Sequence, residues 1–140
     1  IQPQIEQVLD TQLHQTFSYA RVYVKGTNLV RHRDRTSGEW VANVCITRDE
    51  TDWPLYLEME GKSHQVYMNQ GDICIFRGHK DFHWRPKYTG ELQIQAFVSY
   101  VDVLFCVLAL EYCFLLVLKA YLGAGIHRNP CPWRKFLRKT

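Results

Sequence analysis

Residues 69–84, NQGDICIFRGHKDFHW, contain in order a Gly-Asp turn, an apolar run, a short glycine-bearing loop and a segment with a histidine. The apolar run DICIF is short and is bounded by turn residues, which indicates a buried strand. Short strands that follow one another at intervals of roughly ten residues are typical of sandwiches, jelly rolls and barrels. This stretch therefore favours a mainly β fold.

The same pattern extends outward from it. Over residues 17–102, β-rich runs alternate with turns that carry Gly or Pro. The runs are SYARVYV (18–24), GEWVANVCIT (38–47), WPLYLEME (53–60), SHQVYM (63–68), DICIFRG (72–78), DFHWRP (81–86) and ELQIQAFVSYV (91–101). The segment MEGKS (59–63) is typical of a hairpin turn. We predict about seven or eight strands, preceded by an amphipathic helix over residues 1–16, where Ile5, Val8 and Leu9 have helical spacing.

The composition suits one packed domain. The chain has 140 residues, of which 46% are hydrophobic, and a net charge of +3. Much of the positive excess lies in residues 127–140, so the rest is close to neutral and we expect no nucleic-acid partner. The five cysteines are odd in number and form no CxxC pair, which argues against a zinc ribbon or a disulfide framework. With no secretory signal pattern at the start, we expect a reducing, cytoplasmic location.

Residues 103–140 differ from the rest of the chain. VLFCVLALEYCFLLVLKAYLGAG (103–125) is almost wholly apolar, and a basic tail comes after it. Its length is near the roughly 20 apolar residues of a transmembrane helix, but Glu111 would put a carboxylate in mid-span. Three interpretations stay open: a membrane anchor over residues 103–122, a helix packed on the sheet or on a partner, and a misread terminus. We predict a domain over residues 1–102 and assign no chemistry to residues 103–140.

The stretch VRHRDRTSGEW (30–40) contains the first candidate for chemistry. His32 and Asp34 are two residues apart, so in extended backbone their side chains point the same way. Two histidines and one carboxylate on one face hold mononuclear Fe(II) and leave positions open for a cosubstrate and O2. His83 is the candidate for the distant second histidine, with His79 as its rival. Taken alone, the His-x-Asp pattern also fits a solvated polar turn.

In their order and spacing, these motifs resemble the Fe(II)/2-oxoglutarate-dependent dioxygenases, most closely the prolyl-4-hydroxylase-like branch and its small bacterial and phage members. YVKGTNLVRHRD (23–34) has the Tyr-x-x-Gly and the His-x-Asp of that pattern, and residues 69–84 have its second half. The resemblance covers residues 18–102. It implies a double-stranded β-helix (jelly roll) in which His32, Asp34 and His83 bind iron.

The resemblance also implies an activity. A non-haem iron hydroxylase of this kind oxidises a C–H bond of a peptidyl side chain or a small molecule while 2-oxoglutarate is converted to succinate and CO2. Tyr23 would hydrogen-bond the distal carboxylate of 2-oxoglutarate, and ascorbate is an optional further cofactor. No catalytic residue beyond the three metal ligands is expected.

The sequence departs from the family pattern at one place. The family has a Lys or Arg about ten residues after the distal histidine, whereas ELQIQAF (91–97) offers Gln93 and Gln95. A buried dicarboxylate without a positive partner is costly. The alternative therefore stays open that the chain is a cupin-like metal-binding jelly-roll protein without oxygenase turnover.

Strand alternation supplies two replacement cations. Arg85 is two residues beyond His83 and shares its face, and Arg21 shares a face with Tyr23. The planar guanidinium group grips a carboxylate with two hydrogen bonds. We rank Arg85 first and Arg21 second as the partner of 2-oxoglutarate.

Overall fold

The computed structural model describes residues 1–104, which form two antiparallel sheets and one short helix. In chain order the elements are α1 (Gln2–Leu9), β1 (Leu13–Val24), β2 (Leu29–His32), the 3-10 turn η1 (Thr36–Gly38), β3 (Trp40–Arg48), β4 (Leu55–Met59), β5 (Lys62–Val66), β6 (Ile73–Phe76), β7 (Phe82–Arg85) and β8 (Leu92–Asp102). The apolar segment and basic tail lie outside the described residues from residue 105 onward, so the domain boundary after residue 102 stays a prediction.

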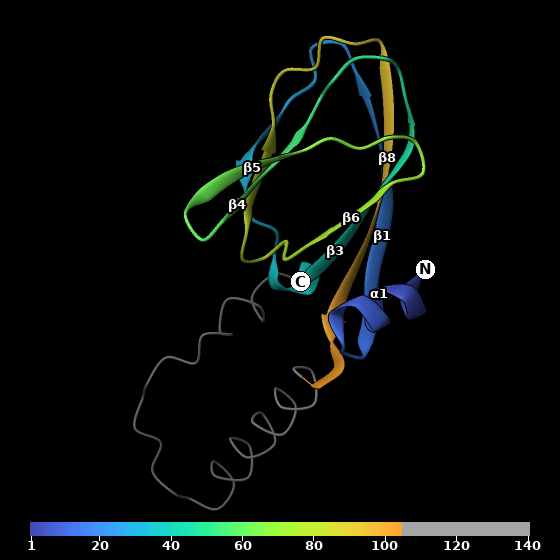
Figure 1. The fold of residues 1–140 in the computed structure, drawn as a ribbon, viewed down its shortest axis with the longest axis vertical. Helices are drawn as coiled ribbons and strands as arrows, with labels where there is room; N and C mark the ends of the chain where they lie inside the picture. The colour runs from blue at the N-terminus through green and yellow to red at the C-terminus, as the bar shows by residue number, and fades with distance from the viewer. Residues whose placement is uncertain (105–140) are drawn as a thin grey trace, which may run out of the picture. The chain divides into compact units, whose positions relative to one another are not determined.

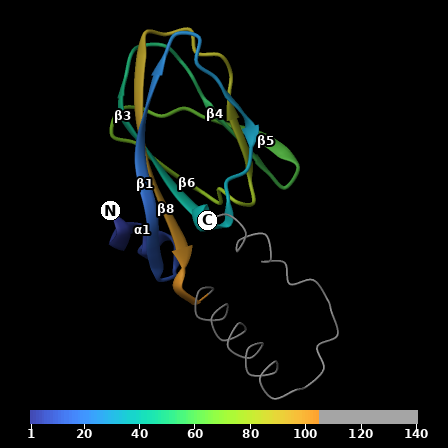
Figure 2. The same ribbon diagram turned by 180° about the vertical axis from the view of Figure 1, so that it is seen from behind.

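Each sheet has four strands, in the orders β1-β8-β3-β6 and β2-β7-β4-β5. Strands that follow one another in the chain thus mostly belong to opposite sheets, which is the connectivity of an eight-stranded jelly roll, or double-stranded β-helix. Figures 1 and 2 show β1 and β8 side by side in one sheet and the β4–β5 hairpin projecting from the other. The predicted fold class is confirmed.

Apolar side chains fill the space between the two sheets. Because side chains alternate between the two faces of a strand, every second residue of β3, β4 and β8 points inward. The resulting cluster contains Val41, Leu55, Leu57, Phe76 and Phe97. The predicted hairpin is also present: β4 pairs with β5, and the turn residues Glu60 and Gly61 both have positive φ, as a type I′ turn requires.

The helix is shorter than predicted over residues 1–16. It ends at Leu9 because Asp10 adopts the left-handed conformation, with φ 51°, and Leu13 is already the first residue of β1. Its buried Ile5 packs against the sheet face that points away from the second sheet, in a cluster with Leu13, Ala42 and Tyr100. The helix therefore covers one end of the β1–β8–β3 sheet, as Figure 1 shows.

Strand β2 was absent from the predicted strands, and it decides how the candidate site is arranged. Opposite β7, Leu29 pairs with Arg85 and His32 pairs with His83. Between these two pairs the chain advances three residues along β2 but only two along β7. Strand β2 therefore contains one extra residue, which is a β-bulge. This bulge allows both Leu29 and His32, which are an odd number of residues apart, to face the interior.

Candidate metal centre

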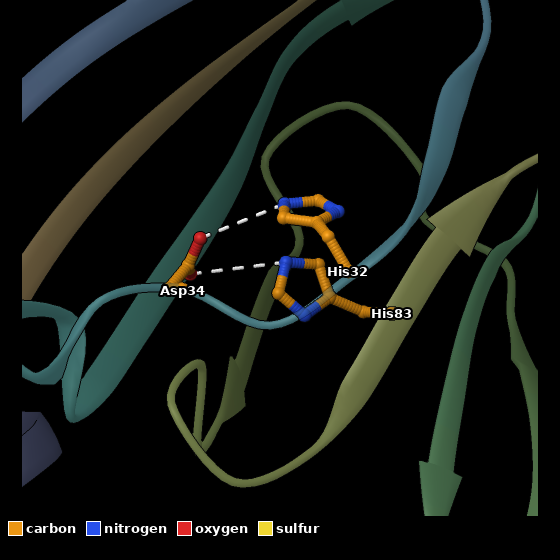
Figure 3. A group of neighbouring side chains, drawn as sticks. All are labelled: His32, Asp34 and His83. Atoms are coloured by element: carbon orange, nitrogen blue, oxygen red, sulfur yellow. Dashed lines mark ion pairs between the residues drawn. The ribbon is translucent and has the colours of Figure 1, made fainter.

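The three predicted metal ligands lie together between the sheets. His32 Nε2 is 3.6 Å from Asp34 Oδ1, and His83 Nε2 is 3.7 Å from Asp34 Oδ2. One ligand atom from each residue lies within 4.8 Å of the others, and Figure 3 shows both imidazoles directed at the same carboxylate. Within residues 1–104 this is the one group of three or more such side chains with that geometry.

The other nitrogen of each ring is already engaged by the main chain. His32 Nδ1 lies 2.8 Å from the carbonyl oxygen of Val30, and His83 Nδ1 lies 3.1 Å from that of Asp81. A carbonyl only accepts, so each Nδ1 carries a proton, and each ring turns its Nε2 toward Asp34. This is how ligating histidines are oriented in metal sites.

The protonation of His83 fits the same arrangement. Burial lowers the pKa of His83, which outweighs the opposing effects of the Asp81 carbonyl and of Asp34. The neutral imidazole needed by a metal ligand is thus favoured. Two lone pairs and one carboxylate facing one another repel, and a bound divalent cation would turn that repulsion into attraction. The donor set therefore fits a metal such as Fe(II).

Asp34 is held by a glycine that the sequence analysis did not single out. The Asp34 amide donates to the carbonyl of Gly78 at 2.8 Å. A Cβ atom at Gly78 would overlap the Asp34 carboxylate, and it would lie 2.7 Å from Val41 and 2.8 Å from the carbonyl oxygen of Gly38. Only glycine lets the loop after β6 approach so closely. In the sequence, RGHK indicated a loop but gave no sign of what the loop touches.

The metal centre opens onto a cavity that also contains the three predicted cosubstrate residues, Tyr23, Arg85 and Arg21. The structure thus brings all six predicted site residues together. The remaining lining residues are Tyr19, Leu29, Val41, Asn43, Leu55, Phe76 and Phe97.

Arg85 is a buried cation with a neutral partner. Its side chain is 2% exposed, its Nη1 donates to the carbonyl of Trp53 at 2.6 Å, and its guanidinium lies over the Trp53 ring. Within the described part of the chain it forms no ion pair. Burial lowers the pKa of Arg85, but an arginine remains charged in proteins. A buried charge without a counter-ion is costly, so this position favours an anionic ligand.

Tyr23 lies beside Arg85 at the deep end of the cavity. It is fully buried, and its ring meets Trp53 edge-on at 4.9 Å. Burial raises the pKa of Tyr23, partly offset by Arg21 and Arg85, so the hydroxyl stays protonated and able to donate. Arg21 is exposed, with its guanidinium carbon 5.3 Å from the Tyr23 ring centre. Arg85 is thus buried and Arg21 exposed, and the ranking of Arg85 above Arg21 stays a prediction.

Where the family pattern has a cation, the interior contains amides. Gln93 and Gln95 are both buried on the inner face of β8. Asn43 is also buried and lines the cavity. The side-chain amides of Asn43 and Gln95 have no hydrogen-bond partner within residues 1–104. These unpaired groups make the interior polar beyond the metal centre.

The other histidines take no part in this centre. His79, the rival for the distal ligand, lies with Nδ1 3.3 Å from the carbonyl of Glu39 and does not belong to the group. His14 and His64 are exposed, as expected. His127 lies outside the described residues. In residues 1–104, no helix has the length and apolar character needed to cross a membrane.

Solved structures share this arrangement of strands. The chain is similar to an oxidoreductase of the 2OG-Fe(II) oxygenase family from Burkholderia pseudomallei, with TM-score 0.58 and 11% identity over 64% of this chain and 45% of that one. It is also similar to a Pseudomonas putida prolyl-4-hydroxylase, with TM-score 0.54 and 18% identity over 69% and 56%. A third is a non-heme monooxygenase, the ThoJ–Ni complex, with TM-score 0.55 and 13% identity over 70% and 48%.

What these proteins share with the chain is the double-stranded β-helix. At such low identity the similarity shows the fold alone, and the chain spans about half the length of each of the three proteins. No protein-family model and no curated protein sequence matches the chain.

Proposed function

We propose that the chain is a non-haem Fe(II)- and 2-oxoglutarate-dependent oxygenase of the hydroxylase type. One observation carries the proposal: two imidazole nitrogens and a carboxylate converge on one point, in a cavity that also contains a buried arginine with no counter-ion among residues 1–104. The first feature calls for a divalent cation and the second for an organic anion. Iron and 2-oxoglutarate meet both requirements.

The metal would be held by His32, Asp34 and His83, which together occupy one face of a six-coordinate ion. When bound, Fe(II) would supply the activation of O2, since such chemistry is carried by cofactors. The chain contributes the orientation of the ligands: the carbonyls of Val30 and Asp81 fix the two rings. The names of the structural neighbours, a 2OG-Fe(II) oxygenase and a prolyl-4-hydroxylase, support the same class.

The distal carboxylate of 2-oxoglutarate would pair with Arg85 and accept a hydrogen bond from Tyr23. The Arg85 nitrogen Nη1 donates to the Trp53 carbonyl, while Nη2 has, among the described residues, only the weak acceptor Met68 Sδ at 4.0 Å. The substrate would be a peptidyl side chain or a small molecule, and ascorbate an optional further cofactor.

Succinate formation tests this function. The full chain is reconstituted with Fe(II) under anaerobic conditions, mixed with 2-oxoglutarate and exposed to O2, and succinate is measured. We expect slow conversion without added substrate, abolished in Asp34→Ala and unchanged in the matched control His64→Ala, whose side chain is exposed on β5. An iron-loaded wild-type chain that forms no succinate would overturn the proposal.

A cupin-like metal-binding protein without turnover is the second candidate. The amides of Gln93 and Gln95 favour it, because they stand where the family pattern has a cation and they carry no charge to pair with a dicarboxylate. Such a protein would bind Fe(II) through the same three ligands but would neither bind 2-oxoglutarate nor form succinate. Calorimetric titration of the metal-loaded chain with 2-oxoglutarate separates the two functions.

A further inference from the structure

Strand β1 contributes a row of side chains to the cavity, and these side chains differ in their exposure to solvent. Alternate residues point inward, and Tyr19, Arg21 and Tyr23 all line the cavity. Tyr23 is fully buried, whereas Tyr19 is 49% exposed. Tyr19 lines the same cavity as the metal ligands His32, Asp34 and His83. The row thus runs from the buried Tyr23 to the half-exposed Tyr19, in the cavity that the metal ligands also line.

Three aromatic rings lie together at the half-exposed end of the row. The Tyr19 ring is nearly parallel to the ring of Phe97, at 4.9 Å and 17°, and to the ring of Phe17, at 6.2 Å and 15°. Phe97 is buried and is the register partner of Tyr19 on β8. Since Tyr19 is half-exposed, a planar group that enters this end of the cavity meets aromatic side chains, and offset stacking is the favourable geometry between aromatic rings.

A cation lies at the same end. Arg35, which comes directly after the metal ligand Asp34, is exposed, and its guanidinium carbon is 4.7 Å from the Phe17 ring centre. The Thr16 hydroxyl donates to the carbonyl of Ser37 at 2.6 Å, which ties the Arg35 loop to β1. Arg35 forms no ion pair with any described residue. Its charge is therefore free to bind an anion.

We propose that Phe17, Tyr19, Phe97 and Arg35 form the subsite for the substrate, and that it takes a planar aromatic ring bearing a carboxylate or a phosphate. The ring would stack on Tyr19 and the anion would pair with Arg35, close to the metal centre. This inference rests on the proposed oxygenase function. An uncharged prolyl peptide would gain nothing from Arg35.

Calorimetric titration of the full chain tests the subsite, with Mn(II) and saturating 2-oxoglutarate present and also with both omitted. The probes are benzoate, adenosine monophosphate, cyclohexanecarboxylate and a short uncharged proline-containing peptide. We expect benzoate or the nucleotide to bind at least about tenfold more tightly than cyclohexanecarboxylate, since stacking on an aromatic side chain contributes that much. Tighter binding of the nucleotide would assign a phosphate-bearing substrate, and tighter binding of benzoate a carboxylate-bearing one.

Two variants and a control make the test specific. Tyr19→Leu and Arg35→Gln should each weaken binding of the tighter probe about tenfold, whereas Lys62→Gln, in the β4–β5 hairpin, should not. Fe(II) affinity is measured in parallel and should stay unchanged, so a failure of the metal centre is seen separately. The inference is overturned if neither planar probe binds, if the peptide or cyclohexanecarboxylate binds as tightly, or if Arg35→Gln has no effect.

Discussion

His32 and His83 are register partners across β2 and β7, and each donates its Nδ1 hydrogen to the carbonyl oxygen two residues earlier in its own strand or loop. Their ring centres are 4.2 Å apart. The same local hydrogen bond thus sets both rings, one from each strand, and turns both Nε2 atoms toward Asp34. Main-chain atoms therefore hold the orientation of both candidate histidine ligands.

Thermal unfolding with and without metal tests the repulsion within this group. Fe(II) or Mn(II) at about a hundredfold excess over its dissociation constant should stabilise the wild-type chain by about 2.7 kcal/mol, a rise of several degrees in Tm. In Asp34→Asn that rise should vanish, and the metal-free Tm should not fall, because an amide can donate to an imidazole where a carboxylate repels it. Circular dichroism after treatment with a chelator measures both. A metal-induced rise that persists in Asp34→Asn would contradict this account.

Gly78→Ala tests the close approach of the β6–β7 loop to Asp34. The added Cβ would displace the Asp34 carboxylate, because Val41 and the Gly38 carbonyl prevent the Cβ itself from moving aside. We expect a loss of roughly 10- to 100-fold in metal affinity, as for other residues that orient metal ligands. The matched control is Gly38→Ala, whose Cβ would lie 3.3 Å from the Asp34 Cβ and should cost less. Equal metal affinities in Gly78→Ala and the wild-type chain would show that Asp34 is not held in this way.

The ranking of the two arginines gives a third prediction. Arg85→Gln should raise the 2-oxoglutarate concentration needed for half-maximal succinate formation by roughly 10- to 100-fold, the loss expected for hydrogen bonds to a charged group. Arg21→Gln should raise it less, because Arg21 is exposed. Fe(II) affinity serves as the control and should be the same in both variants. If only Arg21→Gln raises the requirement, Arg21 is the cation and Arg85 is structural.

The fold and the candidate site differ in how far the sequence could predict them. The strand pattern sufficed for the jelly roll, because turn residues bound nearly every strand. Strand β2 was not predicted because it is four residues long and contains a β-bulge. The helix was predicted too long because Val8 and Leu9 continue the apolar spacing, although Val8 is 73% exposed and Asp10 ends the helix.

At the site, residue types could be predicted and their surroundings could not. His32, Asp34 and His83 have side chains whose chemistry is visible in the sequence. The contacts of Gly78 with Asp34 depend on how a loop packs against a distant strand, which no local pattern encodes. The same holds for Tyr19: its alternation with Tyr23 was visible in SYARVYV, but the sequence did not indicate that Tyr19 stays half-exposed.

The stoichiometry of Fe(II) binding tests the central claim most directly. Anaerobic calorimetric titration of the full chain should give one Fe(II) for each wild-type chain and none for His32→Ala, Asp34→Ala or His83→Ala. Two controls, His79→Ala and His64→Ala, should keep one Fe(II) per chain, because neither side chain belongs to the group. Full binding in Asp34→Ala, or loss of binding in His79→Ala, would contradict a metal centre formed by His32, Asp34 and His83.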